Sequence, residues 1–205
     1  MISHYINGAV ISSQCNRTQS VFNPATGLSI DQVQLGNEED VRLAVAVAKH
    51  AFVSWSEVAP IKRARILFKF KELLDINHKK LAEMITLEHG KILSDAMGEV
   101  SRGIDVVEFA CGIPQLLKTQ FSDNVGGGID QWNLRQALGV TVGITPFNFP
   151  FMVPMWMAPL AIATGNTFIL KPSERDPSIS LFIAELFKQA GLPDGVFNVI
   201  QGDKV

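Results

Sequence analysis

An asparagine held between two prolines is the first candidate for chemistry in this 205-residue sequence. Asn148 lies in the run Thr-Pro-Phe-Asn-Phe-Pro at residues 145–150, directly after a predicted strand. Proline restricts the backbone on both sides, so the amide side chain can be held still as a donor. One such donor stabilises the oxyanion formed by addition to a carbonyl by about 3 kcal/mol. An asparagine that only satisfies the bend is the simpler alternative.

A lysine and a glutamate form the second candidate. Lys171 follows an apolar predicted strand, and Glu174 comes three residues later. An open α/β sheet binds its nucleotide at the carboxyl ends of its strands, where an ammonium and a carboxylate can both hydrogen-bond ribose hydroxyls. A surface ion pair is the alternative interpretation of the same two side chains.

The pattern after residue 139 predicts the scaffold that positions both candidates. Strands are expected at 140–144, 167–170 and 196–200, and helices at 153–164 and 177–190. This β-α-β-α-β alternation predicts a parallel sheet, with both candidates at the carboxyl ends of strands. The strand at 196–200 is expected to leave an exposed edge, so the chain should be poorly soluble or self-associate.

The first half of the chain predicts an amphipathic helical layer. Asn37 is expected to cap one helix, Pro60 to begin the next and Gly90 to end the third. Ser94 is expected to cap a further helix that continues to about Gly112.

Glycine-rich turns predict two kinds of hairpin. The turns at Asn7-Gly8 and at 22–27 indicate an N-terminal hairpin on the outside of the main body. The triplet Gly126-Gly127-Gly128 lies among polar residues and is not followed by Gly-Lys-Ser/Thr. It therefore predicts a hairpin tip and not a phosphate loop.

Composition excludes several classes of function. The net charge is −2, with 18 basic and 20 acidic residues, so neither nucleic acid nor a membrane surface is an expected partner. Cys15 and Cys111 are the only cysteines and form no cluster with histidine, so no metal site is expected. This cysteine usage and the lack of a presequence pattern at Met1 favour a cytoplasmic protein.

The motifs together resemble a known family. Thr-Pro-Phe-Asn-Phe-Pro at 145–150, Gly-Asn-Thr-Phe-Ile-Leu-Lys-Pro-Ser-Glu-Arg at 165–175 and Ala-Gly-Leu-Pro-Asp-Gly-Val-Phe-Asn-Val-Ile at 190–200 resemble the aldehyde dehydrogenase superfamily. Phe147, where most hydrolytic members carry tryptophan, and Arg175 are similar to the CoA-acylating methylmalonate-semialdehyde dehydrogenase branch. The resemblance covers nearly the whole chain.

The resemblance implies a partial aldehyde-dehydrogenase-like α/β fold. Residues 1–120 would form an N-terminal hairpin and the helical part of the NAD-binding domain. Residues 121–138 would form a β-hairpin oligomerisation arm, and residues 139–205 the first half of a Rossmann-like sheet, without the catalytic domain. A homo-oligomer is expected for the full-length family.

The resemblance also assigns roles to individual residues. Asn148 would be the oxyanion donor, while Lys171 and Glu174 would bind the adenosine ribose of NAD. The cofactor cleft would be lined by Thr145, Phe147 and Arg175. Arg102 would pair with the substrate carboxylate, for which its fork of donors is suited. A helix-surface arginine is the alternative interpretation of Arg102.

In this family a cysteine thiolate adds to the aldehyde, hydride passes to NAD, and CoA receives the acyl group with loss of carbon dioxide. The substrate implied is malonate or methylmalonate semialdehyde, and the product acetyl-CoA or propanoyl-CoA. That cysteine lies beyond residue 205 in the family pattern, and Cys111, in an apolar helix, is expected to be a buried structural thiol. The chain alone is expected to be inactive. A non-catalytic binding or oligomerisation remnant, and a related dehydrogenase with another aldehyde, remain as alternatives.

Overall fold

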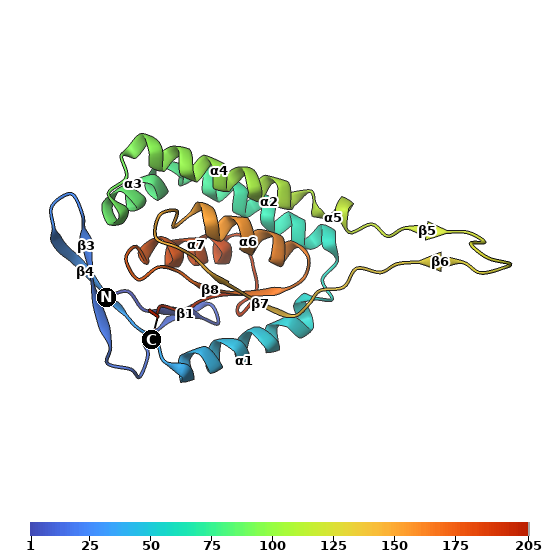
Figure 1. The fold of residues 1–205 in the computed structure, drawn as a ribbon, viewed down its shortest axis with the longest axis horizontal. Coiled ribbons are helices and arrows are strands. Elements are labelled where there is room, and N and C mark those ends of the chain that lie inside the picture. Colours follow the sequence, from blue (N-terminus) through green and yellow to red (C-terminus); the bar gives the residue numbers. More distant parts are fainter. Residues whose placement is uncertain (205) are drawn as a thin grey trace.

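The computed structural model describes residues 1–204 and shows a mixed α/β fold (Figure 1). The elements in chain order are β1 His4–Ile6, β2 Ala9–Ile11, β3 Thr18–Asn23, β4 Leu28–Gln34, α1 Glu38–Trp55, α2 Pro60–Ile76, α3 His78–His89, α4 Leu93–Cys111, α5 Ile113–Leu116, β5 Phe121–Ser122, β6 Gln131–Trp132, β7 Val140–Ile144, α6 Met152–Ala163, β8 Thr167–Lys171, α7 Ser178–Gln189 and β9 Phe197–Val199.

The central sheet has five strands in the order β2-β1-β9-β8-β7. Strands β7, β8 and β9 are parallel, as the β-α-β-α-β pattern predicts, with Ile144 paired to Lys171 and Leu170 paired to Val199. The carboxyl ends of these three strands therefore share one edge of the sheet. This confirms the expected placement of the residues that follow β7 and β8.

The prediction of an exposed edge at β9 is wrong. Strand β1 pairs antiparallel with β9 through Tyr5 and Val199, and all three residues of β1 are buried. The Asn7-Gly8 turn returns the chain as β2, so this hairpin extends the main sheet and does not lie outside it. The open edges are β2 and β7. In β7, Val142 is 59% and Ile144 75% exposed.

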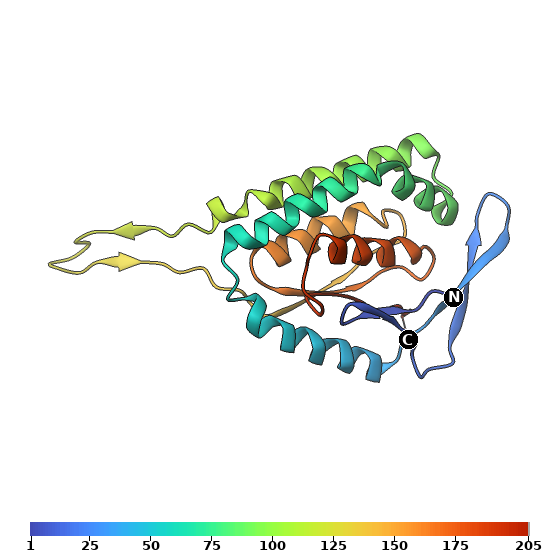
Figure 2. The ribbon, with the colours of Figure 1, turned by 180° about the vertical axis from the view of Figure 1, so that it is seen from behind.

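Helices cover both faces of the sheet. Figure 2 shows α1 alone on one side and α6 and α7 on the other, with α2 and α4 stacked outside them. Ala44 and Ala48 of α1 pack against Ile169 and Ile200. A larger core on the opposite face includes Phe70 of α2, whose ring stacks on Phe187 of α7 at 3.7 Å between centroids.

The helix boundaries follow the sequence signals with one exception. The Asn37 side chain accepts from the backbone of Glu39 and Asp40, which confirms the expected cap of α1. Gly90 ends α3 in the left-handed conformation at a φ of 83°. Ser94 is not a cap, because α4 already begins at Leu93 and its N-cap position is Ile92, without a side-chain cap.

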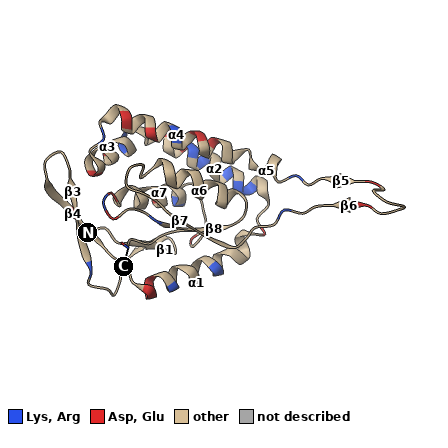
Figure 3. Cartoon of the chain, in the orientation of Figure 1, with Lys and Arg blue, Asp and Glu red and all other residues tan. Residues whose placement is uncertain are grey.

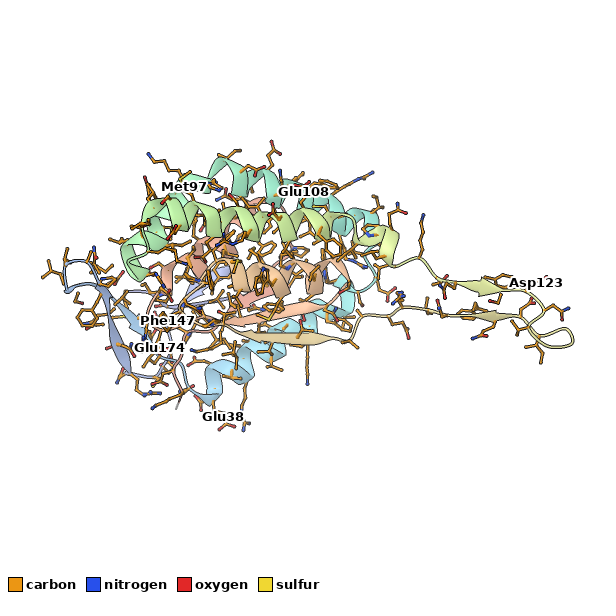
Figure 4. All side chains as sticks on the ribbon, turned by 45° about the horizontal axis from the view of Figure 1, so that its top comes forward. Glu38, Met97, Glu108, Asp123, Phe147 and Glu174 are labelled. Carbon is orange, nitrogen blue, oxygen red and sulfur yellow. The ribbon has the colours of Figure 1, made fainter. Side chains whose placement is uncertain are left out.

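Strands β5 and β6 form a ribbon that projects away from the body (Figure 1), with Asp123 near its tip (Figure 4). The Asn124 side chain accepts from the backbone of Gly128 at 2.7 Å, and Gly127 and Gly128 have positive φ. The glycine triplet is therefore a hairpin tip, as predicted. The ribbon exposes Phe121, Val125, Ile129, Trp132 and Leu134.

Charges of both signs lie close together on the helical layer. Lysine and arginine lie along α2 beside acidic residues of α4 (Figure 3), and Lys71 lies 2.9 Å from Asp75 and 3.8 Å from Glu108. Within residues 1–204 no helix combines the length and apolarity needed to cross a membrane. The same residues contain no group of three histidine, cysteine or acidic side chains that could hold a metal ion.

Candidate functional site at the strand ends

The two motifs meet where β7 and β8 end. The backbone N–H of Thr145 donates to the carbonyl of Lys171 at 3.1 Å, which continues the β7–β8 ladder by one residue. Thr145 is buried, and the loop beyond it carries Phe147 and Asn148 to the surface. Figure 4 labels Phe147 and Glu174 at the same end of the molecule, and the residue after Glu174, Arg175, contacts the Phe147 ring. The fold thus brings both candidate groups to one edge.

Phe147 joins the loops that follow the two strands. The guanidinium carbon of Arg175 lies 4.7 Å from the centroid of the Phe147 ring. The imidazole of His89, at the end of α3, stacks on the same ring at 6.0 Å. Burial and the nearby positive charge of Lys91 lower the pKa of His89. Phe147 is still 44% exposed, so part of its ring remains available to a planar ligand.

Lys171 and Glu174 form an accessible ion pair. The Lys171 ammonium lies 3.3 Å from a carboxylate oxygen of Glu174, and the side chains are 22% and 28% exposed. Beside them, Gly202 follows β9 closely enough that a Cβ there would lie 3.9 Å from Lys171 Cε. An ammonium and a carboxylate in this position can each bond a hydroxyl of a ribose laid across the strand ends.

Behind the loop lies a pair that sequence reasoning missed. The ammonium of Lys91 lies 2.6 Å from Glu99 Oε2, donates to the backbone oxygen of Asn148 at 3.0 Å and lies 4.4 Å from the centroid of the Phe149 ring. The other oxygen of Glu99 accepts from the backbone N–H groups of Phe151 at 3.0 Å and Met152 at 3.2 Å. A carboxylate is stabilised at a helix N-terminus, so Glu99 anchors the start of α6.

A second buried glutamate anchors α7. Glu88 accepts from the backbone N–H of Ser178 at 3.1 Å and from its hydroxyl. Burial is the main cause that raises the pKa of Glu88. The helices that follow β7 and β8 therefore both begin on a carboxylate supplied by the helical layer. Neither N-terminus is free to hold a phosphate, although helix N-termini bind phosphates in many nucleotide folds.

Asp176 is a buried carboxyl group beside this site. Only 2% of Asp176 is exposed, and neither carboxyl oxygen has a hydrogen-bond partner among residues 1–204. Burial, and then the charge of Glu88, raise the pKa of Asp176 to about 8. Asp176 therefore carries a proton over most of the neutral range. It lines a cavity of about 320 Å³ with Gln19, Ser20, Phe22, Pro24, Glu88, His89, Phe147 and Arg175.

Arg102 lies on α4, one turn after Glu99. Its Nε is 3.4 Å from the sulfur of Met152, at the start of α6. The side chain is exposed, and no carboxylate pairs with it within the part of the chain that the structure describes. The guanidinium is thus available beside the Asn148 loop, and its role as a substrate ligand stays a prediction.

Cys111 is a buried thiol, as expected. It is 5% exposed at the end of α4, and burial raises its pKa to about 11. A thiol with such a pKa is almost wholly protonated at neutral pH and is a poor nucleophile.

One sequence signal could have revealed the supporting pair. Glu99 lies on the apolar face of α4 together with Ala96, Gly103 and Val107, all of them buried. A carboxylate on a core-facing stripe needs a partner, which points to a buried ion pair or a helix cap. Lys91 follows the glycine that ends α3 and carries no comparable signal, and neither does Asp176.

The comparisons with known proteins agree with this geometry. The model of the aldehyde dehydrogenase family matches residues 10–205. The chain is 53% identical to a malonate-semialdehyde dehydrogenase of Pseudomonas aeruginosa, covering 99% of the chain and 41% of that protein. It is 52% identical to malonate-semialdehyde dehydrogenase 2 of Bacillus mycoides, covering 98% of the chain and 42% of that protein.

Solved structures give the same result. The crystal structure of methylmalonate-semialdehyde dehydrogenase from Oceanimonas doudoroffii is 55% identical, with a TM-score of 0.96, over 99% of this chain and 41% of that one. A Sinorhizobium meliloti structure, described as a methylmalonate-semialdehyde dehydrogenase complexed with NAD, is 49% identical, with a TM-score of 0.97 and the same coverage.

The matched region is the N-terminal portion of these structures. The chain spans about 41% of the length of the Pseudomonas relative and of both structures. Because the family model matches nearly the whole chain, the protein belongs to the aldehyde dehydrogenase family.

Proposed function

We propose that this chain supplies the N-terminal, cofactor-binding part of an NAD-dependent, CoA-acylating dehydrogenase of malonate or methylmalonate semialdehyde. The observation that carries the proposal is the contact of Thr145 with Lys171, which joins the Asn148 loop to the Lys171–Glu174 pair. The similarity to malonate- and methylmalonate-semialdehyde dehydrogenases supports the substrate, and the Sinorhizobium structure with NAD supports the cofactor.

Each candidate residue has a role in this proposal. Lys171 and Glu174 bind the adenosine ribose, because both polar groups are accessible at the end of β8. In this proposal Thr145, Phe147 and Arg175 line the cofactor cleft, and the contact of the Arg175 guanidinium with the Phe147 ring supports the role of the last two. A planar ring can lie on the exposed part of Phe147, and the fixed cation of Arg175 attracts phosphate.

Asn148 and Arg102 act on the aldehyde. The Asn148 amide donates to the oxygen that becomes negative when a thiolate adds to the carbonyl. Arg102 pairs with the carboxylate of the semialdehyde and orients it. NAD, when bound, supplies a hydride acceptor, and CoA receives the acyl group. Because the pKa of buried Cys111 is about 11, Cys111 is not the reacting thiolate in this proposal.

Titration of NAD into the purified chain tests the cofactor site. The wild-type chain should release heat on binding in calorimetry, and Lys171→Met should weaken binding about tenfold or more because a charged hydrogen bond is lost. Lys188→Met is the matched control. Lys188 also pairs with a carboxylate, Asp194, but lies near the turn that precedes β9, at the opposite edge of the sheet. Equal affinities of the two variants would reject this assignment of Lys171.

Product analysis of the complete gene product tests the reaction. Incubation with malonate or methylmalonate semialdehyde, NAD and CoA should yield acetyl-CoA or propanoyl-CoA with NADH. NADH formed only from a different aldehyde would favour the related dehydrogenase. A protein that forms no NADH from any aldehyde would be the non-catalytic remnant.

Both cysteines are free, which supports a reducing, cytoplasmic setting for the reaction.

We further propose that the β5–β6 ribbon joins copies of this chain into a homo-oligomer. It exposes Phe121 and Trp132 at 64% and 67% beyond the body of the protein. Exposed apolar side chains on a projecting ribbon are typical of a contact surface. Trp132→Glu should lower the mass measured by sedimentation, whereas Phe68→Glu, at an exposed position of α2, should not. An unchanged mass of the Trp132 variant would reject the proposal.

A further inference from the structure

We infer that Lys91 is a positioning residue for Asn148: its ammonium fixes the backbone that carries the proposed oxyanion donor. The inference rests on the proposed function, because it concerns the same reaction. It adds a residue that lies outside both sequence motifs, in the short connection between α3 and α4.

The Lys91 ammonium contacts both the Asn148 loop and Glu99, which supports that loop. Its partners are Glu99 Oε2 at 2.6 Å, the backbone oxygen of Asn148 at 3.0 Å and the face of the Phe149 ring at 4.4 Å. The Lys91 side chain is only 13% exposed. An ammonium with so little exposure, and with an anion, a carbonyl and a ring face around it, has little freedom to move.

Glu99 holds the other end of the same loop. It is fully buried, and its second oxygen binds the N–H groups of Phe151 and Met152. The Lys91–Glu99 pair therefore contacts the chain on both sides of Phe149 and Pro150. A shift of Lys91 would move the Asn148 backbone relative to α6, while α6 itself would stay anchored by Glu99.

The loop needs this external support. Pro146 and Pro150 have no backbone N–H, so neither residue can donate to the sheet or to α6. The Asn148 side chain is exposed, and its amide makes no hydrogen bond within the described part of the chain. The bond from Lys91 to the Asn148 carbonyl thus holds the residue in place while leaving its amide free for a ligand.

A pair of lysine variants tests the inference on structure and on rate. Lys91→Met keeps the length of the side chain and removes the ammonium, while Lys91→Arg keeps a cation and donors. Lys188→Met is the control, because Lys188 also donates to a backbone carbonyl, that of Gly8 at 2.5 Å. The Asn148 side-chain amide signal is followed by ¹⁵N NMR in the 205-residue chain, and kcat and KM in the complete gene product.

For Lys91→Met we expect a shifted and broadened Asn148 amide signal. We also expect a fall in kcat of about 10- to 100-fold, since small displacements of a catalytic donor have effects of this size. The KM for NAD should be unchanged, because the Lys171–Glu174 pair is untouched. Lys91→Arg should retain more of the rate than Lys91→Met. A merely structural role would lower thermal stability without this selective loss of kcat.

The inference is overturned if Lys91→Met keeps the kcat and the Asn148 signal of the Lys188→Met control. If Lys91→Met fails to fold, Glu99→Gln replaces it, since a glutamine oxygen can still accept from α6 while the ion pair is lost. That variant should lower kcat in the same direction, and an unchanged kcat would overturn the inference. A wild-type gene product that forms no acyl-CoA would overturn the proposed function instead, while the NMR comparison still decides whether Lys91 positions Asn148.

Discussion

The amide of Thr145 and the carbonyl of Lys171 are joined by a 3.1 Å hydrogen bond, and this contact places two distant sequence motifs side by side. It continues the parallel register in which Ile144 is paired with Lys171. Because this register aligns the carboxyl ends of β7 and β8, Asn148 and Glu174 each lie a few residues beyond the same edge of the sheet. The geometry of the site is thus a consequence of the β7–β8 pairing, and the helical layer only refines it.

Replacement of Asn148 separates catalysis from cofactor binding. Asn148→Ala in the complete gene product should slow acylation about 100-fold or more, because one oxyanion donor is lost. The affinity for NAD should not change, since Lys171 and Glu174 remain. Rapid-mixing measurement of the first NADH formed reports the acylation step directly. Asn16→Ala, at an exposed position between β2 and β3, serves as control, and equal acylation rates for the two variants would reject the oxyanion role.

Loss of the Glu99 carboxylate should destabilise the fold strongly. Glu99→Ala leaves the largely enclosed Lys91 ammonium without its anion and two N–H groups at the start of α6 without acceptors. Breaking a buried pair in this way costs about 3–5 kcal/mol. Urea unfolding gives the value. Glu83→Ala should change the free energy of unfolding by less than about 1 kcal/mol, because its pair with Lys79 is exposed. Similar losses for both variants would contradict the role of Glu99.

The loss of unfolding free energy at acidic pH should depend on His4. His4 is fully buried, and its Nδ1 accepts from the backbone N–H of Gln201 at 3.0 Å, so the ring is neutral in the fold. Burial lowers the pKa of His4, although Asp40 lies 3.6 Å from Nε2 and raises it. The unfolded state therefore takes up the proton first, and stability is lost as the pH falls below about 6.5.

His4→Gln removes this proton uptake. The difference in unfolding free energy between wild type and His4→Gln should shrink between pH 7 and pH 5, as measured by urea unfolding at each pH. His50→Gln, at an exposed position of α1, is the control. A difference that stays constant with pH would show that His4 does not titrate in this way.

Much of the fold could be predicted from the sequence, because the signals are local. Asn37 and Gly90 mark helix ends through their own backbone and side-chain chemistry, and each strand of the β-α-β-α-β run has its own apolar pattern. The predicted N-cap at Ser94 was wrong for a local reason too, because α4 begins one residue before Ser94. The pairing of β1 with β9 is a contact between the two ends of the described chain, which no local pattern records.

The candidate site also contains residues with a local sequence signal and residues brought in by long-range contacts. The types and spacing of Asn148, Lys171 and Glu174 mark them as site candidates in the sequence. The same motifs do not include their support, because Lys91 and Glu99 contact the loop across the helical layer. Glu99 can be recognised in the sequence as a carboxylate on the apolar face of a predicted helix. Asp176 has no such signal, because it precedes α7 in a turn and is buried only by tertiary packing.

The edge of β9 gives a test of that long-range pairing. Deletion of residues 1–11 removes β1 and β2 and leaves β9 as an open edge, paired only with β8. An open apolar edge promotes association between chains. Light scattering should therefore show larger aggregates for the shortened chain at a concentration where the wild type gives none. A shortened chain with unchanged scattering and an unchanged melting temperature would mean that β1 contributes little to the sheet.

Asp176 should give the opposite pH dependence from His4. Its folded pKa is raised from 3.8 to about 8, so the folded state holds a proton that the unfolded state has released between these values. Stability is therefore greatest below about pH 4 for this group and is lost as the pH rises toward 8, by up to about 1.4 kcal/mol per pH unit. Asp176→Asn, which carries no charge at any pH, should remove this slope and be more stable than wild type at pH 8. Asp123→Asn, on the exposed ribbon, is the control. Parallel curves for wild type and Asp176→Asn between pH 5 and pH 8 would show that this carboxyl group stays ionised in the fold.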